Sequence, residues 1–308
     1  MRSYFLKILL VLAACSMTSL IIGESAKNSI PAQSPKTVKY KTIDDTTLRL
    51  HVFAPSKTIS GTRTSAIVFF FGGAWTTGTP EQFYPQCRYF ASLGSVAISA
   101  EYRIKSKYDI SISDCIKDAK SAIRWVRANA DKLNVAPDKI IAAGGSAGGH
   151  LAACTAVIDG YEEENEDLSI SSKPNAVVLF NPALGTTEDG YGSKRLTDRI
   201  RDISPMHHVK KGIPPFIIFH GIKDKTVPIQ TIESFCKLME DAGNNCKLVP
   251  FEGMGHGFFN YGEHDNKPFE ETLRAADEFL TQLGFLAPKP SKDMGGIGLE
   301  PTTPTMSR

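Results

Sequence analysis

A single serine stands among glycines in the stretch IIAAGGSAGGHLAA, residues 140–153. Ser146 has the spacing G-x-S-x-G, with Gly144 and Gly148 on either side. A glycine inside a strand or helix costs roughly 0.5–1 kcal/mol relative to alanine, so the cluster needs a reason. A sharp strand-to-helix turn gives one, because it exposes a nucleophilic hydroxyl where backbones come too close for side chains. The alternatives are a turn that only packs a helix on a strand, or a phosphate loop, although no G-K-[ST] follows.

A serine hydroxyl attacks a substrate efficiently only when a base removes its proton. His256 lies in EGMGHGFF, directly after a strand-like segment, and its glycine neighbours allow the imidazole to reach Ser146. Asp224 lies in FHGIKDKTVP, after the preceding strand-like segment, and can accept the other imidazole N–H. Taken alone, His256 and Asp224 are each better explained as ordinary loop residues. Because each follows its own strand in the order Ser, Asp, His, the three together predict a catalytic triad.

Acyl transfer also needs hydrogen-bond donors for the oxygen that becomes negative during the reaction. The stretch FFFGGAW, residues 69–75, follows an apolar run and contains two glycines that permit close approach of the backbone. We expect an oxyanion hole made by the N–H groups of Gly72, Gly73 and Ala74, with Ala147 as a further donor. A simple turn after a strand is the alternative.

The elements that position these residues alternate between strand-like and helix-like segments. VKYKTI and LRLHVF flank DDTT and predict an N-terminal antiparallel hairpin. Further strands are predicted for AIVFFF, SVAISAEY, KIIAAG, AVVLFN, PPFIIFHG and CKLVPF. Helices are predicted for residues 110–130, 147–158, 229–243 and 269–284. This alternation predicts a mostly parallel central sheet with helices on both faces and a site at the carboxyl ends of the strands.

The motifs of residues 36–286 resemble, in their order, those of α/β-hydrolase-fold esterases. They are FGGAW, EYR, DAKSAIRWVRANA, GGSAGGHLAA, FNP, SP, HGIKDKTVP and GMGHGF. The most similar branch is the bacterial acetylxylan and feruloyl esterase-like group, near the hormone-sensitive-lipase-like enzymes. The resemblance implies an α/β-hydrolase fold in which Tyr102, Arg103 and Asp118 are scaffold residues. These families usually have histidine where this chain has Phe71, and we expect the hole to survive because backbone groups form it.

These observations predict a serine carboxylesterase that cleaves short-acyl, acetyl-type esters through an acyl-enzyme and needs no cofactor. Trp75 follows the glycines of FGGAW, and its indole would suit a pocket wall or a platform for a sugar face. Burial of Trp75 in the core is the alternative. The resemblance, together with export, implies a small ester or an acylated polysaccharide as substrate. The alternative classes are an amidase or peptidase and a non-catalytic binding relative.

The two ends of the chain differ from its middle. Residues 1–26 begin with basic MRSYFLK and continue with apolar ILLVLAACSMTSLIIG, which predicts a signal peptide and export. Within it, LAAC resembles the lipobox of bacterial lipoproteins and implies lipidation of Cys15 and a membrane tether. The alternatives are an ordinary signal peptide and an uncleaved membrane anchor. We expect a linker at 27–37, a catalytic domain at 38–286 and a disordered tail at 287–308.

Net charge and cysteine spacing bear on two further classes of function, nucleic-acid binding and metal binding. The 308 residues carry a formal net charge of +2, which gives no indication of a nucleic-acid partner. The cysteine spacing matches no zinc motif, so we expect no metal. We expect most cysteines to be small core residues, and Cys236 and Cys246 are the nearest candidates for a disulfide.

Overall fold

The computed structural model describes residues 33–56, 62–186 and 200–288. The expected signal peptide with Cys15 lies outside these residues, as do most of the expected linker and most of the expected tail. The first strand begins at Lys36 and therefore takes in the last two residues of the expected linker 27–37. None of the helices in the described ranges is long and apolar enough to cross a membrane.

One eight-stranded sheet runs through the molecule in the order β1-β2-β4-β3-β5-β6-β7-β8. The first pair is antiparallel, β2 pairs antiparallel with β4, and every pairing from β4 through β8 is parallel. The strands are β1 (Lys36–Ile43), β2 (Thr46–Phe53), β3 (Thr64–Phe70), β4 (Val96–Ala100), β5 (Val135–Gly145), β6 (Ala176–Phe180), β7 (Phe216–Gly221) and β8 (Cys246–Phe251). The predicted fold class, a mostly parallel sheet with an N-terminal antiparallel hairpin, is confirmed.

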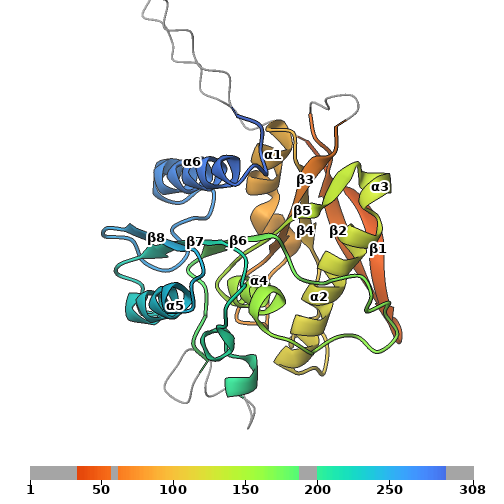
Figure 1. Ribbon diagram of the computed structural model, residues 1–308, viewed down its shortest axis with the longest axis horizontal. Helices are drawn as coiled ribbons and strands as arrows, with labels where there is room; N and C mark the ends of the chain where they lie inside the picture. Colours follow the sequence, from red (N-terminus) through yellow and green to blue (C-terminus); the bar gives the residue numbers. More distant parts are fainter. Residues whose placement is uncertain (1–32, 57–61, 187–199, 289–308) are drawn as a thin grey trace, which may run out of the picture.

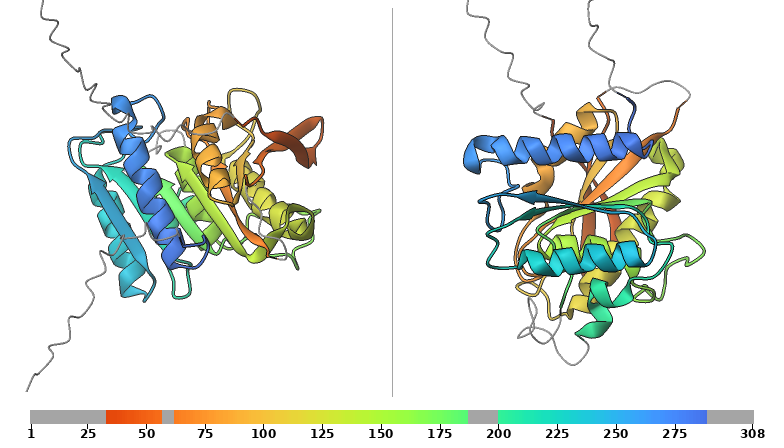
Figure 2. Two further views of the ribbon diagram at one scale, coloured as in Figure 1. Left: turned by 90° about the horizontal axis from the view of Figure 1, so that it is seen from above. Right: turned by 60° about the vertical axis from the view of Figure 1, so that its left-hand side comes forward.

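Helices cover both faces of the sheet. Figures 1 and 2 show α1 and α6 on one face and α2, α4 and α5 on the other. The helices are α1 (Tyr84–Ser92), α2 (Ile112–Ala128), α3 (Ala130–Leu133), α4 (Ala147–Val157), α5 (Ile229–Asp241) and α6 (Lys267–Gln282). The short 3-10 helices are η1 (Pro80–Phe83), η3 (Arg201–Ile203), η4 (Pro205–His208) and η5 (His264–Asn266). All predicted helices are present, and η1 with α1 were not predicted.

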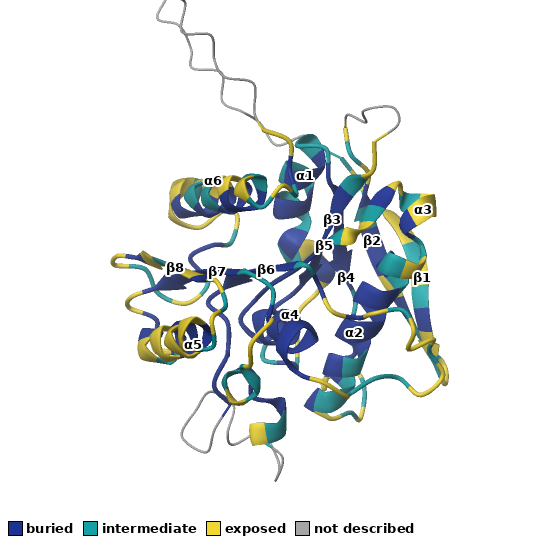
Figure 3. Cartoon of the chain, in the orientation of Figure 1, coloured by how far each residue is buried: buried dark blue, intermediate teal, exposed yellow. Residues whose placement is uncertain are grey.

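The central strands are apolar because both of their faces are covered. Every residue of β4, β6 and β7 is buried, as Figure 3 shows for the middle of the sheet. Cys87, Cys115 and Cys154 are unpaired and buried within this core, which confirms the expected role of most cysteines. Cys236 on α5 and Cys246 on β8 form the disulfide that the sequence offered as the nearest pair.

The scaffold residues that the resemblance named form a buried ionic cluster. Asp118 on α2 is fully buried and accepts hydrogen bonds from Arg103 and Lys41. A buried carboxylate needs such partners, because an unpaired charge would carry a large desolvation cost. The cluster therefore ties β1 and the segment after β4 to α2. Among the described residues, the ion pairs and hydrogen bonds of this cluster do not involve Ser146, so its role is structural.

Candidate active site

Ser146 occupies a sharp turn between the end of β5 and the start of α4. Its backbone has φ 53° and ψ −118°, a conformation that L-residues rarely adopt. A Cβ on Gly148 would lie 2.0 Å from the carbonyl oxygen of Phe70, and one on Gly144 would lie 2.4 Å from that of Gly148. Both positions therefore require glycine. The glycines of G-x-S-x-G let α4 pack on β3 and β5 while Ser146 stands at the turn.

The structure brings together the three side chains that the sequence predicted as a triad. His256 Nε2 lies 2.9 Å from Ser146 Oγ, and His256 Nδ1 lies 2.7 Å from Asp224 Oδ2. The imidazole side chain keeps a quarter of its surface exposed, whereas the Asp224 carboxylate is buried. In this arrangement the hydroxyl donates to one ring nitrogen while the other ring nitrogen donates to the carboxylate. The geometry is that of a nucleophile, a general base and a group that orients the base.

The Asp224 carboxylate is held ionised by its surroundings. Burial is the largest influence and raises its pKa, but hydrogen bonds from His256, the Val227 N–H and the Asn181 side chain outweigh burial. Together they lower the pKa of Asp224 to about 2 from its ordinary value of 3.8. Asn181, in the FNP motif after β6, is fully buried and has φ 43°, so its amide is fixed toward Asp224. Motif order predicted Asp224 but gave Asn181 no role.

His220, at the end of β7, lies beside the same carboxylate. It is fully buried, and its Nε2 lies 2.9 Å from the Val227 carbonyl oxygen and 3.6 Å from Asp224 Oδ2. Burial lowers the pKa of His220, so this imidazole is held neutral. Its contacts support the turn that carries Asp224. Among the described histidines, His256 is the one whose side chain hydrogen-bonds the Ser146 hydroxyl.

The loop after β3 presents fewer oxyanion donors than the sequence predicted. The Gly72 N–H donates to Gln82 Oε1 at 2.6 Å, so the prediction of Gly72 as a free donor is wrong. Gly73 (φ 124°) and Ala74 (φ 55°) have positive φ, and this turns their peptide groups differently from the extended strand. Among the described residues, no group accepts from the N–H of Gly73, Ala74 or Ala147. Ala147 is the first residue of α4, where N–H groups lack helical partners.

The side chain of Trp75 does not line a pocket. It is fully buried, and its Nε1–H donates to His150 Nδ1 on α4 at 3.3 Å. The prediction of a pocket wall or sugar platform is therefore wrong, and the alternative of a core residue holds. The reason is backbone direction, because φ 58° at Trp75 turns its side chain inward against α4. Trp75 thus anchors the oxyanion loop to α4.

Phe71, which stands where related families have histidine, is also part of the support of this loop. Its ring stacks on that of Tyr102 with centroids 4.2 Å apart, and the Tyr102 hydroxyl donates to the Phe71 carbonyl oxygen at 2.8 Å. The aromatic stack fixes the residue that precedes the glycines.

Across the described residues, no group of three or more histidine, cysteine or acidic side chains could hold a metal ion.

Residues 50–182 and 184–239 match BD-FAE, and the matched ranges contain Ser146 and Asp224. The chain belongs to the BD-FAE family. The BD-FAE match ends before His256, so the base is located by the structure rather than by the family ranges.

Relatives of this BD-FAE chain carry esterase names. Esterase LipC of Mycobacterium tuberculosis is 32% identical over 213 residues, which are 62% of this chain and 52% of LipC. ICMEL1 of Arabidopsis thaliana, a probable isoprenylcysteine alpha-carbonyl methylesterase, is 28% identical over 236 residues, 68% of this chain and 48% of ICMEL1. The chain spans about half the length of these curated relatives.

Solved structures place the fold among esterases. The apo form of esterase 2 from Thermogutta terrifontis is 50% identical, with a TM-score of 0.80 over 85% of this chain and 98% of that chain. Other structures of the same esterase contain propionate or butyrate. The fold of this BD-FAE chain is therefore the α/β-hydrolase fold of esterases, as the motifs indicated.

Proposed function

We propose that the protein is a serine carboxylic ester hydrolase with Ser146, His256 and Asp224 as its catalytic triad. The observation that carries the proposal is the continuous hydrogen-bonded chain from Ser146 Oγ through His256 to Asp224 Oδ2. The esterase names of the relatives favour an ester over an amide or peptide as substrate. A non-catalytic relative of this fold would not need a base in contact with a serine on a strained turn.

The reaction follows from the positions of these groups. His256 takes the proton of Ser146 as Oγ attacks the ester carbonyl, and the ionised Asp224 stabilises the imidazolium that forms. The N–H groups of Gly73, Ala74 and Ala147 stabilise the negative oxygen of the tetrahedral intermediate. His256 then protonates the departing alcohol, which leaves an acyl group on Ser146. Water activated by His256 releases the acid and restores the serine.

We further propose that the acyl group is short. Esterase 2 of Thermogutta terrifontis, which aligns over most of this chain, has been solved with propionate and with butyrate. Both are acids of the kind that a short-acyl esterase releases. The buried Trp75 gives no support to a sugar platform, so an acylated polysaccharide as the natural substrate stays a prediction.

A chain-length series tests the proposed substrate class. We expect kcat/KM for p-nitrophenyl esters to be high for acetyl to butyryl groups and to fall steeply by octanoyl. Release of acetate from acetylated xylan tests the polysaccharide prediction, with p-nitrophenyl acetate as the control substrate. Preference for octanoyl over acetyl would contradict the short-acyl proposal.

We also propose that the protein is exported, because a basic and then apolar segment opens the sequence. The Cys236–Cys246 disulfide supports this proposal, since disulfides persist mainly in oxidising compartments. If Cys15 carries a lipid, a fatty-acid probe should label wild type and should not label Cys15→Ser. If both proteins fractionate alike and neither is labelled, the lipid anchor is contradicted. Export is tested separately, by whether the signal peptide is cleaved.

A further inference from the structure

Two side-chain amides join the oxyanion loop to the loop that carries His256. Gln82 on η1 accepts from the Gly72 N–H at 2.6 Å and donates through Nε2 to Asn260 Oδ1 at 3.0 Å. Asn260 in turn donates through Nδ2 to the Gly257 carbonyl oxygen at 2.9 Å. The result is a continuous hydrogen-bonded path from the residue before the oxyanion donors to the residue after His256.

The path lies beside the nucleophile. A Cβ on Gly72 would lie 3.4 Å from Ser146 Cβ and 3.6 Å from Gln82 Oε1. The Gln82 amide therefore contacts the oxyanion loop at the point where that loop passes Ser146. A displacement of Gln82 would move the donors relative to the serine.

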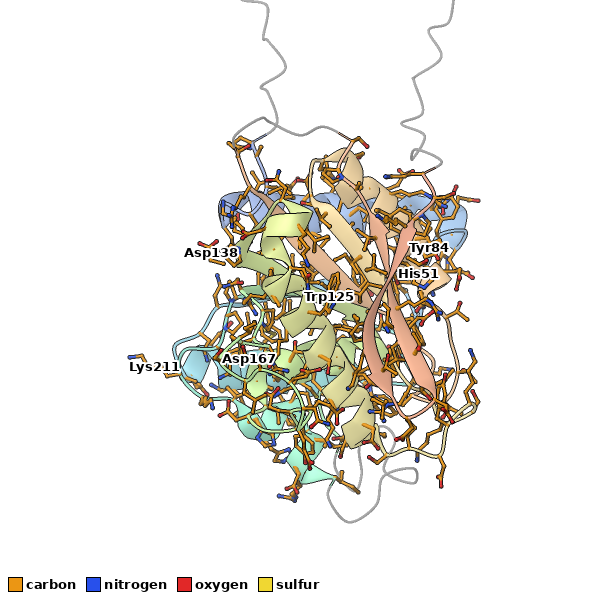
Figure 4. The ribbon with its side chains drawn as sticks, turned by 90° about the vertical axis from the view of Figure 1, so that its right-hand side faces the viewer. His51, Tyr84, Trp125, Asp138, Asp167 and Lys211 are labelled. Atoms are coloured by element: carbon orange, nitrogen blue, oxygen red, sulfur yellow. A yellow bond between two sulfur atoms is a disulfide. The ribbon has the colours of Figure 1, made fainter. Side chains whose placement is uncertain are left out.

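The segment that carries Gln82 is itself firmly held. Four residues further on, Gln86 is fully buried and donates to the Phe259 carbonyl oxygen at 3.4 Å. The Phe259 ring stacks on Phe83 with centroids 6.0 Å apart and fills the space where a side chain at Gly145 would lie. On the opposite side, Figure 4 shows Tyr84 next to His51 of β2, and the two side chains hydrogen-bond at 2.6 Å.

The oxyanion loop and the loop that carries His256 need such a connection, because the residues of neither loop hold its backbone rigidly on their own. Ala74 and Trp75 have positive φ, which costs about 1–3 kcal/mol each unless neighbouring contacts hold them. His256 lies between Gly255 and Gly257, which restrict the backbone little. An amide suits the connecting position because it accepts with its oxygen and donates with its nitrogen at the same time. A glutamate accepts only, and its charge would oppose a neighbouring oxyanion.

We propose that Gln82 and Asn260 form an amide bridge that sets the position of the oxyanion donors relative to His256, with Gln82 as a positioning residue for acyl transfer. This inference rests on the proposed esterase function. The bridge acts on the transition state, because only there does the negative oxygen meet the donors while the imidazole carries the proton.

Steady-state kinetics with p-nitrophenyl acetate test the bridge in the variants Gln82→Ala, Asn260→Ala and the double variant. We expect kcat to fall about 10- to 100-fold in each single variant, with KM changed by less than about threefold. The double variant should lose little more than the worse single variant, because both changes break one path. Gln230→Ala, at an exposed glutamine on α5, is the control and should retain wild-type kcat.

Two further readouts separate positioning from a general loss of structure. The affinity for a trifluoromethyl ketone, whose adduct places an oxyanion in the hole, should fall by the same factor as kcat. In Gln82→Glu, the activity relative to wild type should rise as the pH is lowered, because a protonated carboxyl again offers one donor and one acceptor. Melting temperatures show whether each variant is folded, and Asn260→Ala carries the test if Gln82→Ala is not.

The outcomes distinguish this inference from the function on which it rests. Wild-type kcat and inhibitor affinity in folded Gln82→Ala and Asn260→Ala would overturn the bridge while Ser146→Ala remains inactive. Full additivity in the double variant would also overturn it. Activity that survives in Ser146→Ala would instead overturn the esterase mechanism, whatever the Gln82 variants show.

Discussion

The triad contributes unequally to catalysis through Ser146, His256 and Asp224. Substituting each residue in turn measures its contribution to kcat. Ser146→Ala should lower kcat by about 10⁴-fold or more, and His256→Ala should cost about as much, because the two act as a unit. Asp224→Asn should cost somewhat less, since the nucleophile and the base both remain. Circular dichroism should show that all three variants are folded. Retained activity in His256→Ala, with a loss in His207→Ala or His220→Ala, would identify a different base.

His150 accepts a hydrogen bond from the indole of Trp75 in the oxyanion loop. Its pKa predicts how the stability of the fold depends on pH. Burial lowers its pKa to about 4 from its ordinary value of 6.5. The unfolded chain therefore binds a proton before the folded protein does, and stability is lost as the pH falls from about 6.5 to about 4. The loss from this group is about 3 kcal/mol. Urea unfolding at several pH values should show a flatter dependence in His150→Gln, and equal slopes would contradict this assignment.

Individual residues were predictable to different degrees. The triad followed from motif order, because each member comes after its own parallel strand and those strands end at one edge. Gly72 was placed wrongly because its N–H donates to Gln82, a residue that the sequence gives no reason to connect with it. Trp75 was placed wrongly because, with φ 58°, its indole packs inward and donates to His150 on α4. Asn181 lies in the FNP motif, to which the sequence assigned no catalytic role, and Gln82 lies outside the motifs. Their roles appear only when strands and helices distant in sequence are brought together.

At the scale of elements, the turn between β5 and α4 depends on the absence of side chains. Gly148→Ala should be strongly destabilising or prevent folding, because its Cβ would lie 2.0 Å from the Phe70 carbonyl oxygen. Gly255→Ala is the matched control, since the nearest atom to its Cβ is 3.9 Å away. Melting temperatures should fall far more for the first variant. Similar melting temperatures for both variants would contradict the packing of α4 on β3.

The connection of α5 to β8 depends on the disulfide. Replacing both Cys236 and Cys246 by serine opens a short loop and should lower the free energy of unfolding by about 2–3 kcal/mol. Urea unfolding with and without a reductant measures this effect. The reductant should destabilise wild type and leave the double variant unchanged. A reductant that has no effect on wild type would contradict the disulfide.

The segment η1–α1 was not predicted from the sequence. Two prolines, Pro80 and Pro85, interrupt its pattern of apolar residues, and both lie in the first turn of a helix, where proline is tolerated. The segment covers one face of the sheet beside α6 and carries Gln82 (Figure 1). Its omission from the predicted elements is also why the amide bridge was not foreseen.

At the scale of the whole molecule, alternation of strands and helices predicted the class of fold. Continuous apolar runs identified the parallel strands, because only strands covered on both faces carry them. In the sheet, β4 lies between β2 and β3. This order was not predictable from periodicity, since strand pairing depends on contacts between segments far apart in sequence. The family resemblance pointed to the α/β-hydrolase fold, and the structure supplies the strand order.

The whole fold serves to present one nucleophile, Ser146, and covalent labelling tests this most directly. The protein is treated with the organophosphate paraoxon, and intact mass and peptide mapping give the number and position of the phosphoryl groups. We predict one group per chain, located on Ser146, with esterase activity lost in proportion to labelling and no labelling of Ser146→Ala. Labelling at another residue, or loss of activity without a group on Ser146, would contradict the account.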